Sequence, residues 1–150
     1  MSNKSKSGAT EALRPEQSQD RQPGREDQMT PRPRADDQQR AGSGKLRNRV
    51  ALITGGDSGI GRAVAIAFAK EGADVCIVYL EEHQDAADTR ELVERAGGRC
   101  LSLAGDVGDP EQCRGFVAET VARLGRLDIL VNNAAEQHVC ESIEQISPEQ

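Results

Sequence analysis

Residues 50–61 read Val-Ala-Leu-Ile-Thr-Gly-Gly-Asp-Ser-Gly-Ile-Gly. The run from Val50 to Thr54 is largely apolar and ends in two glycines, as does a strand that is covered on both faces of a parallel sheet. The segment from Ile60 to Lys70 predicts a helix, with one stripe formed by Ile60, Val64, Ala67 and Phe68. This part of the chain therefore predicts a strand, a glycine-rich turn and a helix, in that order.

The same alternation continues along the chain. Further strands are predicted at residues 75–80, 100–104 and 128–131, and further helices at 85–96 and from 110 to about 124. The last of these helices has a strong start, because Asp109 can cap it, Pro110 suits its first position and Gln112 can complete a capping box. Four strands that alternate with three helices predict the α/β class and a doubly wound parallel sheet.

The first 45 residues have a different composition, rich in Pro, Gln, Arg, Asp, Ser and Gly. Residues 1–45 are therefore expected to form a disordered polar tail, and residues 46–150 the domain. The net charge is −6, and the basic residues of the tail alternate with acidic ones, so neither nucleic acid nor an anionic membrane is favoured as a partner. No apolar run approaches the length of a membrane span or forms a leader. The four cysteines lack metal-ligand spacing, and reduced thiols in a cytoplasmic protein are expected.

The glycines of the turn suit a phosphate ligand. Gly55 permits a tight exit from the strand, Gly59 allows close approach to a ligand, and Gly61 allows the helix to pack against the sheet. The free N–H groups and positive dipole end of the following helix can then bind a pyrophosphate. A flexible turn without a ligand is the alternative, and the strand-turn-helix context makes it the weaker one.

Three motifs resemble one family. The Thr-Gly-x-x-x-Gly-x-Gly pattern of residues 54–61 is similar to the cofactor turn of short-chain dehydrogenases/reductases, which have a Rossmann-like NAD(P)-binding fold. Asp106-Val107 after the third strand and the Asn-Asn-Ala motif at residues 132–134 follow in the family's order. The resemblance covers residues 45–150, with Ala135 in place of the family's glycine, and extends to bacterial general-stress and glucose/ribitol-type dehydrogenases.

The resemblance implies a set of cofactor-binding residues. Those expected at the pyrophosphate and adjoining ribose are Gly55, Ser58, Gly59, Ile60 and Gly61. Those expected along the adenosine are Tyr79 and Leu80 at its ribose, Asp106 and Val107 at its adenine, and Asn133 and Ala134 at the end of the fourth strand. The reaction implied is hydride transfer between a nicotinamide and a small alcohol or carbonyl substrate, in an enzyme that is commonly tetrameric.

The choice between NAD and NADP depends on the end of the second strand. Residues 79–82 read Tyr-Leu-Glu-Glu, which has neither the acid typical of NAD enzymes nor a basic residue for a 2′-phosphate. Glu81 and Glu82 would repel that phosphate, which favours NAD, with NADP possible. Arg62 is the one nearby cation, and a solvated surface position for it is an equal alternative.

The family's catalytic Ser, Tyr and Lys are expected beyond residue 150, so no catalytic residue is assigned. Tyr79 is the only tyrosine, and no Tyr-x-x-x-Lys pattern follows it. His138 and Cys140 lack the pattern of a catalytic pair or a metal site. Residues 147–150 resemble the opening of a helix, which indicates C-terminal truncation. An inactive NAD(P)-binding fragment, a nucleotide sensor and a non-functional product remain alternatives to the enzyme.

Overall fold

The computed structural model describes residues 18–19, 26–37, 39–135, 142 and 144. Four strands and three α-helices follow a short 3-10 helix in the predicted order. Their bounds are η1 Glu26–Gln28, β1 Val50–Thr54, α1 Gly59–Lys70, β2 Asp74–Tyr79, α2 His83–Arg95, β3 Cys100–Ala104, α3 Pro110–Leu124 and β4 Ile129–Val131. The predicted strands at 50–54 and 100–104 are confirmed residue for residue, whereas β2 begins one residue early and ends before Leu80.

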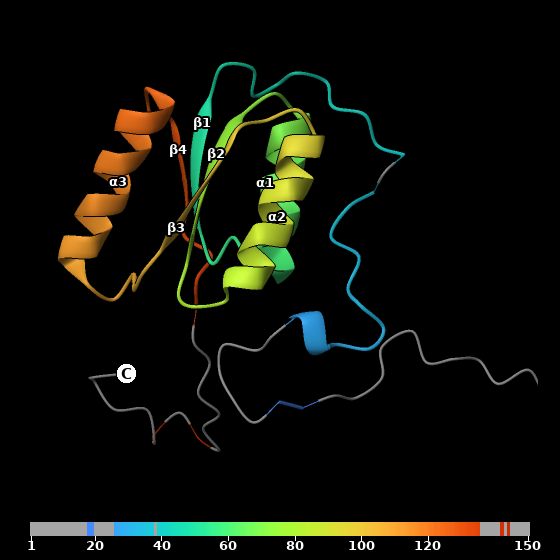
Figure 1. Cartoon of the computed structure of the whole chain (residues 1–150), viewed down its shortest axis with the longest axis vertical. Helices are drawn as coiled ribbons and strands as arrows, with labels where there is room; N and C mark the ends of the chain where they lie inside the picture. Colours follow the sequence, from blue (N-terminus) through green and yellow to red (C-terminus); the bar gives the residue numbers. More distant parts are fainter. Residues whose placement is uncertain (1–17, 20–25, 38, 136–141, 143, 145–150) are drawn as a thin grey trace, which may run out of the picture.

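The strands form one parallel sheet in the order β3-β2-β1-β4. Helices α1 and α2 cover one face of the sheet and α3 covers the other, which confirms the α/β class (Figure 1). The chain moves outward from β1 to β2 and β3, and then returns to the other side of β1 to form β4. In sheets of this kind, ligands bind outside the carboxyl ends of the strands at the point where the strand order reverses. The carboxyl ends of β1 and β4 are therefore the edge of this sheet where a ligand is expected.

Successive residues of the central strands point into two separate cores. On the α1 and α2 side, Ile53 and Ile77 are fully buried against alanines of α1 and α2. On the α3 side, Leu52 and Val78 pack with Phe116. Since a strand alternates its side chains between the two faces of a sheet, a continuous apolar run is needed to fill both cores.

The buried face of α1 differs from the predicted stripe. Ala65, Ile66 and Ala69 are buried, whereas Ile60 is 76% exposed and Ala67 is exposed as well. The interface is built from small residues, which let the helix lie close to the sheet. The predicted stripe is therefore wrong for Ile60 and Ala67, whereas Val64 and Phe68 are partly buried and pack against this core.

The predicted start of α3 is confirmed in its main feature. The Asp109 carboxylate accepts hydrogen bonds from the backbone N–H groups of Glu111 at 2.8 Å and Gln112 at 3.4 Å. The capping box differs, because Gln112 Oε1 accepts from the backbone N–H of Asp106 at 3.0 Å, not from that of Asp109. The side chain of Gln112 thus fixes the turn between β3 and α3.

Residues 26–37 and 39–45, here called the N-terminal arm, contact the domain along α1 and α2 (Figure 1). Three donors at Ser43 and Lys45 bond the Glu71 carboxylate at 2.8–3.0 Å, and Lys70 pairs with Asp36 at 2.5 Å. A Cβ atom on Gly42 would lie 1.7 Å from the Lys70 carbonyl oxygen, so the backbones are in close contact there. Composition alone did not predict these contacts.

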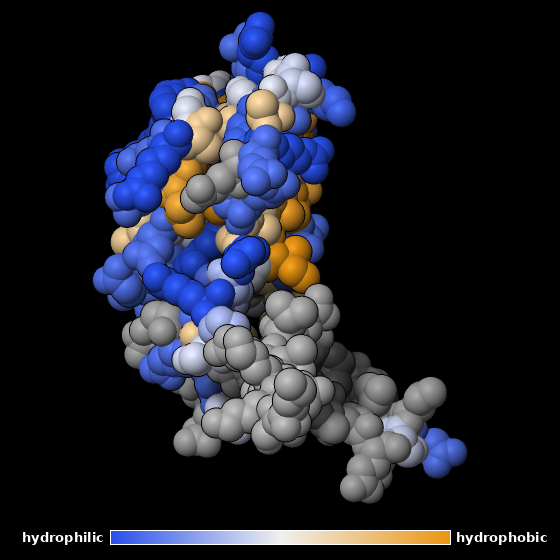
Figure 2. All heavy atoms as spheres, turned by 90° about the vertical axis from the view of Figure 1, so that its right-hand side faces the viewer, coloured by the Kyte–Doolittle hydropathy of each residue, from blue (hydrophilic) through white to orange (hydrophobic). Residues whose placement is uncertain are grey.

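The described surface is mostly hydrophilic when seen from the side of α1, α2 and the arm, with smaller hydrophobic patches between charged groups (Figure 2). Cys76, Cys100 and Cys113 are free thiols, whereas Cys140 lies outside the described residues. In the described ranges, no three His, Cys, Asp or Glu side chains are grouped as metal ligands. No helix of that part is long and apolar enough to cross a bilayer.

Candidate functional site

The turn between β1 and α1 has the backbone shape that its glycines predicted. Gly55 and Gly59 have φ angles of +61° and +52°, which side chains disfavour. A Cβ atom on Gly61 would lie 1.9 Å from the Gly55 carbonyl oxygen, so only glycine allows α1 to start so close to the turn. A Cβ atom on Gly59 would meet nothing within 4 Å, which leaves this side of the turn open.

The first turn of α1 presents donors for an anion. Ser58 is the N-cap residue in an extended conformation, and its side chain makes no capping bond. Among the described residues, no acceptor bonds the backbone N–H groups of Ile60 and Gly61. Free N–H groups at the start of a helix, together with the positive end of its dipole, favour an anionic ligand. The chemistry of this donor set fits a phosphate or diphosphate.

Asn133 ties β4 to the turn. Its side-chain amide donates to the carbonyl oxygens of Thr54 and Gly55, each at 3.0 Å. The backbone N–H groups of Asn133 and Ala134 both donate to the Thr54 hydroxyl at 3.0 Å. Asn133 and Ala134 therefore border the turn, and the amide of Asn133 fixes the backbone that carries the N–H donors.

The end of β2 lies beside the turn, because the backbone N–H of Gly56 donates to the Val78 carbonyl oxygen at 3.2 Å. Tyr79 shares a hydrogen bond of 3.0 Å between its hydroxyl and His83 Nδ1, and Leu80 is 48% exposed. Burial, together with the nearby Asp57 carboxylate, raises the pKa of Tyr79 above its ordinary value. Its hydroxyl is thus protonated at neutral pH and available as a neutral hydrogen-bonding group.

The end of β3 forms the next boundary of this region. The backbone N–H of Gly105 donates to the Tyr79 carbonyl oxygen at 2.8 Å, which places the β3–α3 turn beside the end of β2. Asp106 Oδ1 accepts from the backbone N–H of Gly108 at 2.7 Å, and Val107 is 40% exposed. The structure thus brings the predicted residues to one edge of the sheet, while their contact with a cofactor stays a prediction.

Arg62 is buried, and the solvated position considered for it is wrong. Its side chain donates to the Asp57 carbonyl oxygen at 2.7 and 3.0 Å, to the Thr89 hydroxyl at 2.8 Å and to Asp85 at 3.2 Å. It also pairs with Glu26 of the arm. The guanidinium is hydrogen-bonded to all of these partners, and the residue as a whole is only 3% exposed. A signal was present in the sequence, because Asp85 and Thr89 are four residues apart and share a face of α2.

Several buried acidic residues lie behind the turn, near Asp57. Asp57, Glu82 and Asp85 are each less than 10% exposed. Burial, followed by the charges of Glu82 and Asp85, raises the pKa of Asp57 above its ordinary value. Since one buried cation faces several carboxylates, the region behind the turn disfavours a further anion.

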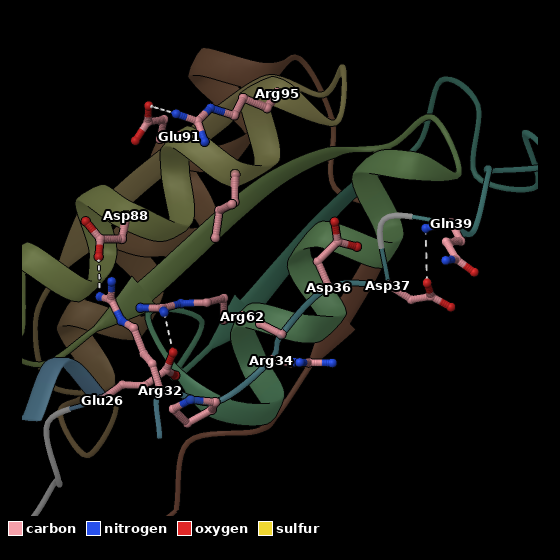
Figure 3. A pocket seen from close by; sticks show the side chains of 13 residues that line it. Glu26, Arg32, Arg34, Asp36, Asp37, Gln39, Arg62, Asp88, Glu91 and Arg95 are labelled. Carbon is pink, nitrogen blue, oxygen red and sulfur yellow. Dashed lines mark hydrogen bonds and ion pairs between the residues drawn. The ribbon is translucent and has the colours of Figure 1, made fainter. Parts of the chain in front are cut away.

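A hollow of about 720 Å³ lies between the arm and the outer sides of α1 and α2 (Figure 3). Charged side chains line it, among them Arg32, Asp36, Asp88 and Arg95. It includes Arg62 but none of the residues of the open side of the turn. We therefore place the candidate ligand at the start of α1 and not in this hollow.

Comparison with known proteins agrees with this geometry. A family model described as short chain dehydrogenase matches residues 49–150. The chain is 60% identical over 141 residues to an uncharacterized oxidoreductase, YhdF, of Bacillus subtilis and 57% identical over 136 residues to its general stress protein 39. These alignments cover 94% and 91% of this chain but 48% of each relative, so the chain spans about half the length of the curated relatives it matches.

Solved structures give the same result. A short chain dehydrogenase from Burkholderia cenocepacia in complex with NADP superposes with a TM-score of 0.64 at 35% identity, covering 70% of this chain and 42% of that one. Carveol dehydrogenase from Mycobacterium avium in complex with NAD superposes with a TM-score of 0.65 at 31% identity, covering 71% and 43%. With the family match extending over more than half of the sequence, the chain belongs to the short-chain dehydrogenase family.

Proposed function

We propose that this chain forms the dinucleotide-binding half of an oxidoreductase that transfers a hydride between a nicotinamide cofactor and an alcohol or carbonyl substrate. The observation that carries the proposal is the pair of N–H groups, of Ile60 and Gly61, that no acceptor in the described part of the chain bonds at the start of α1. They lie at the carboxyl end of β1, where the strand order reverses. The bound nicotinamide supplies the hydride chemistry, and this chain binds and orients the dinucleotide.

Each predicted residue has a defined task in this proposal. Ile60 and Gly61 donate to the diphosphate, with Gly55, Ser58 and Gly59 shaping the turn around it. Tyr79 and Leu80 lie along the adenosine ribose, Asp106 and Val107 along the adenine, and Asn133 and Ala134 at the end of β4. The structures of relatives named above hold NADP in one case and NAD in another, which supports a nicotinamide dinucleotide in general.

We propose NAD as the preferred cofactor. A 2′-phosphate needs a cation, and the nearest candidate, Arg62, is buried with Glu26 and Asp85 as its partners. Glu82 is buried close to Asp57, and both add negative charge on this side of the turn. Calorimetric titration with NAD⁺ and NADP⁺ tests the preference, and tighter binding of NADP⁺ overturns it.

Ile60→Glu is the sharpest test of the site itself. Ile60 is 76% exposed, so the change leaves the core intact and places an anion at the proposed diphosphate. An acidic residue in the first turn also suits the helix dipole, so stability should not fall. We expect NAD⁺ binding to weaken at least tenfold. Val121→Glu on α3, at a position 43% exposed, is the matched control and should bind as the unaltered chain does.

The 150 residues taken alone should bind the dinucleotide without turning over a substrate. Tyr79 is the only tyrosine, and its hydroxyl is bonded to His83 at the end of β2. In this proposal, the family's general acid/base tyrosine lies in the part of the relatives' length that this chain does not span. A small alcohol or carbonyl substrate, a tetrameric assembly and a cytoplasmic location are proposals for that whole protein. Measurable alcohol oxidation by the isolated chain would refute the binding-only assignment.

A further inference from the structure

The N-terminal arm reaches the candidate site through one carboxylate. Glu26 Oε2 accepts from the backbone N–H of Gly59 at 2.7 Å, and Glu26 Oε1 pairs with Arg62. The backbone N–H of Glu26 donates to Asp85 Oδ2 at 3.3 Å. The Glu26 side chain is 4% exposed. Both carboxylate oxygens and the backbone of Glu26 are therefore engaged, and all three contacts are to the turn or to residues that support it.

The rest of the arm keeps Glu26 in place. Arg32 pairs with Asp88 of α2 at 2.7 Å (Figure 3). Lys70 of α1 donates to the Asp37 carbonyl oxygen at 2.7 Å. Figure 3 shows Glu26 and Arg62 facing one another across the same region. These contacts join the arm to both helices that flank the turn. The family match begins at residue 49, so this part of the chain lies outside it.

A carboxylate at a helix start could act in two ways on a diphosphate site. It could compete with the ligand for N–H donors, or it could fix the turn for the ligand. Of the backbone N–H groups in the first turn of α1, Glu26 bonds that of Gly59, and those of Ile60 and Gly61 are left without an acceptor among the described residues. Its charge is also paired with Arg62. The observed contacts favour the second role.

Gly59 is the residue of the turn whose backbone conformation is least restricted by its own surroundings. Its φ angle of +52° is one of two conformations that glycine adopts with similar ease, and no side chain packs within 4 Å of its open side. The bond to Glu26 selects one orientation of the peptide that leads into α1. That orientation decides where the N–H groups of Ile60 and Gly61 point.

We propose that Glu26 is a positioning residue of the dinucleotide site: it holds Gly59 and Arg62 so that the first turn of α1 is ordered before the ligand arrives. The inference rests on the proposed dinucleotide-binding function. Ordering a site in advance lowers the entropy lost on binding, so loss of Glu26 should weaken the dinucleotide even though Glu26 does not touch it. A competing carboxylate would have the opposite effect.

The test compares Glu26→Ala, Glu26→Gln and the control Asp36→Asn in the whole chain. Asp36 is an acidic residue of the same arm that pairs with Lys70, away from the turn. Binding of NAD⁺ is measured by calorimetry, and amide exchange is followed in the peptide that contains residues 55–62. We expect Glu26→Ala to raise the Kd at least tenfold and to speed exchange in that peptide. Glu26→Gln should have a smaller effect, and Asp36→Asn should stay within twofold of the unaltered chain.

An unchanged or lower Kd in a folded Glu26 variant overturns the inference. Should Glu26→Ala fail to fold, Glu26→Gln decides the question, because it keeps the shape of the side chain and removes the charge. Failure of the unaltered chain to bind any nicotinamide dinucleotide refutes the proposed function instead. The exchange rate of the 55–62 peptide still reports whether Glu26 orders the turn in that case.

Discussion

Replacement of Gly61 by alanine tests how closely α1 must approach the turn. The new Cβ atom would lie 1.9 Å from the Gly55 carbonyl oxygen and 2.8 Å from Asn133 Nδ2, whereas real contacts stay above 3.0 Å. Relief needs a displacement of about 1.1 Å, the difference between 3.0 and 1.9 Å, and both obstacles are held by hydrogen bonds. Overpacking of this kind costs up to about 3 kcal/mol. Alanine regains about 1 kcal/mol of helix propensity, which leaves a net loss of about 2 kcal/mol.

Urea unfolding followed by circular dichroism measures this loss, with Gly115→Ala as the matched control. Gly115 lies inside α3, and a Cβ atom there meets nothing within 4 Å, so alanine should stabilise the chain by about 1 kcal/mol. The two alanine variants should thus differ by about 3 kcal/mol in the free energy of unfolding. NAD⁺ binding should be lost in Gly61→Ala and kept in Gly115→Ala. Equal stability of the two variants would refute the steric reasoning.

Three further predictions follow from the described contacts. Asn133→Ala removes two side-chain hydrogen bonds to the turn and should cost about 1–3 kcal/mol by urea unfolding, with weaker NAD⁺ binding; an unchanged Kd contradicts the role given to this amide. Hydrogen bonds, first from Arg126, lower the pKa of Asp128 to about 2, below its unfolded value, so its stabilising effect is complete above pH 4 or so and is lost as the pH falls towards 2. Asp128→Asn should therefore destabilise the chain at pH 7 and lose that effect near pH 2 in acid-unfolding curves. Burial raises the pKa of Cys76, and raises that of Cys100 to about 12, so mass-spectrometric labelling at pH 8 should find both thiols slow to alkylate until urea is added.

The parts of the fold that the sequence predicted are those with local causes. Strand β1 ends at Thr54, directly before Gly55. Helix α3 begins after Asp109 and ends before Gly125, which adopts a left-handed conformation. Each of these limits depends on residues next to it in the chain. The parallel sheet with its helices between the strands was also predicted, because a regular alternation of strands and helices favours that arrangement.

The errors concern contacts between distant segments. The burial of Arg62 depends on Asp85 and Thr89, more than 20 residues away, and on Glu26 in a tail whose composition predicts no order. The burial of small residues on α1, and not of Ile60, depends on how closely the helix approaches the sheet. Periodicity records the spacing of apolar residues along one helix and contains no information on that distance.

Hydrogen bonds from β2, β4 and the N-terminal arm hold the turn after β1, and they reduce the conformational freedom that it can lose when a ligand binds. Gly56 bonds β2, the amide of Asn133 holds the turn from β4, and Glu26 holds it from the arm. Gly61 brings the helix against the turn, and Arg62, the next residue, enters the space between α1 and α2. The position of the donors is thus determined by segments that are more than 100 residues apart in the chain. A turn that is ordered in this way loses little conformational freedom when it binds a diphosphate, so contacts that never touch the ligand contribute to its affinity.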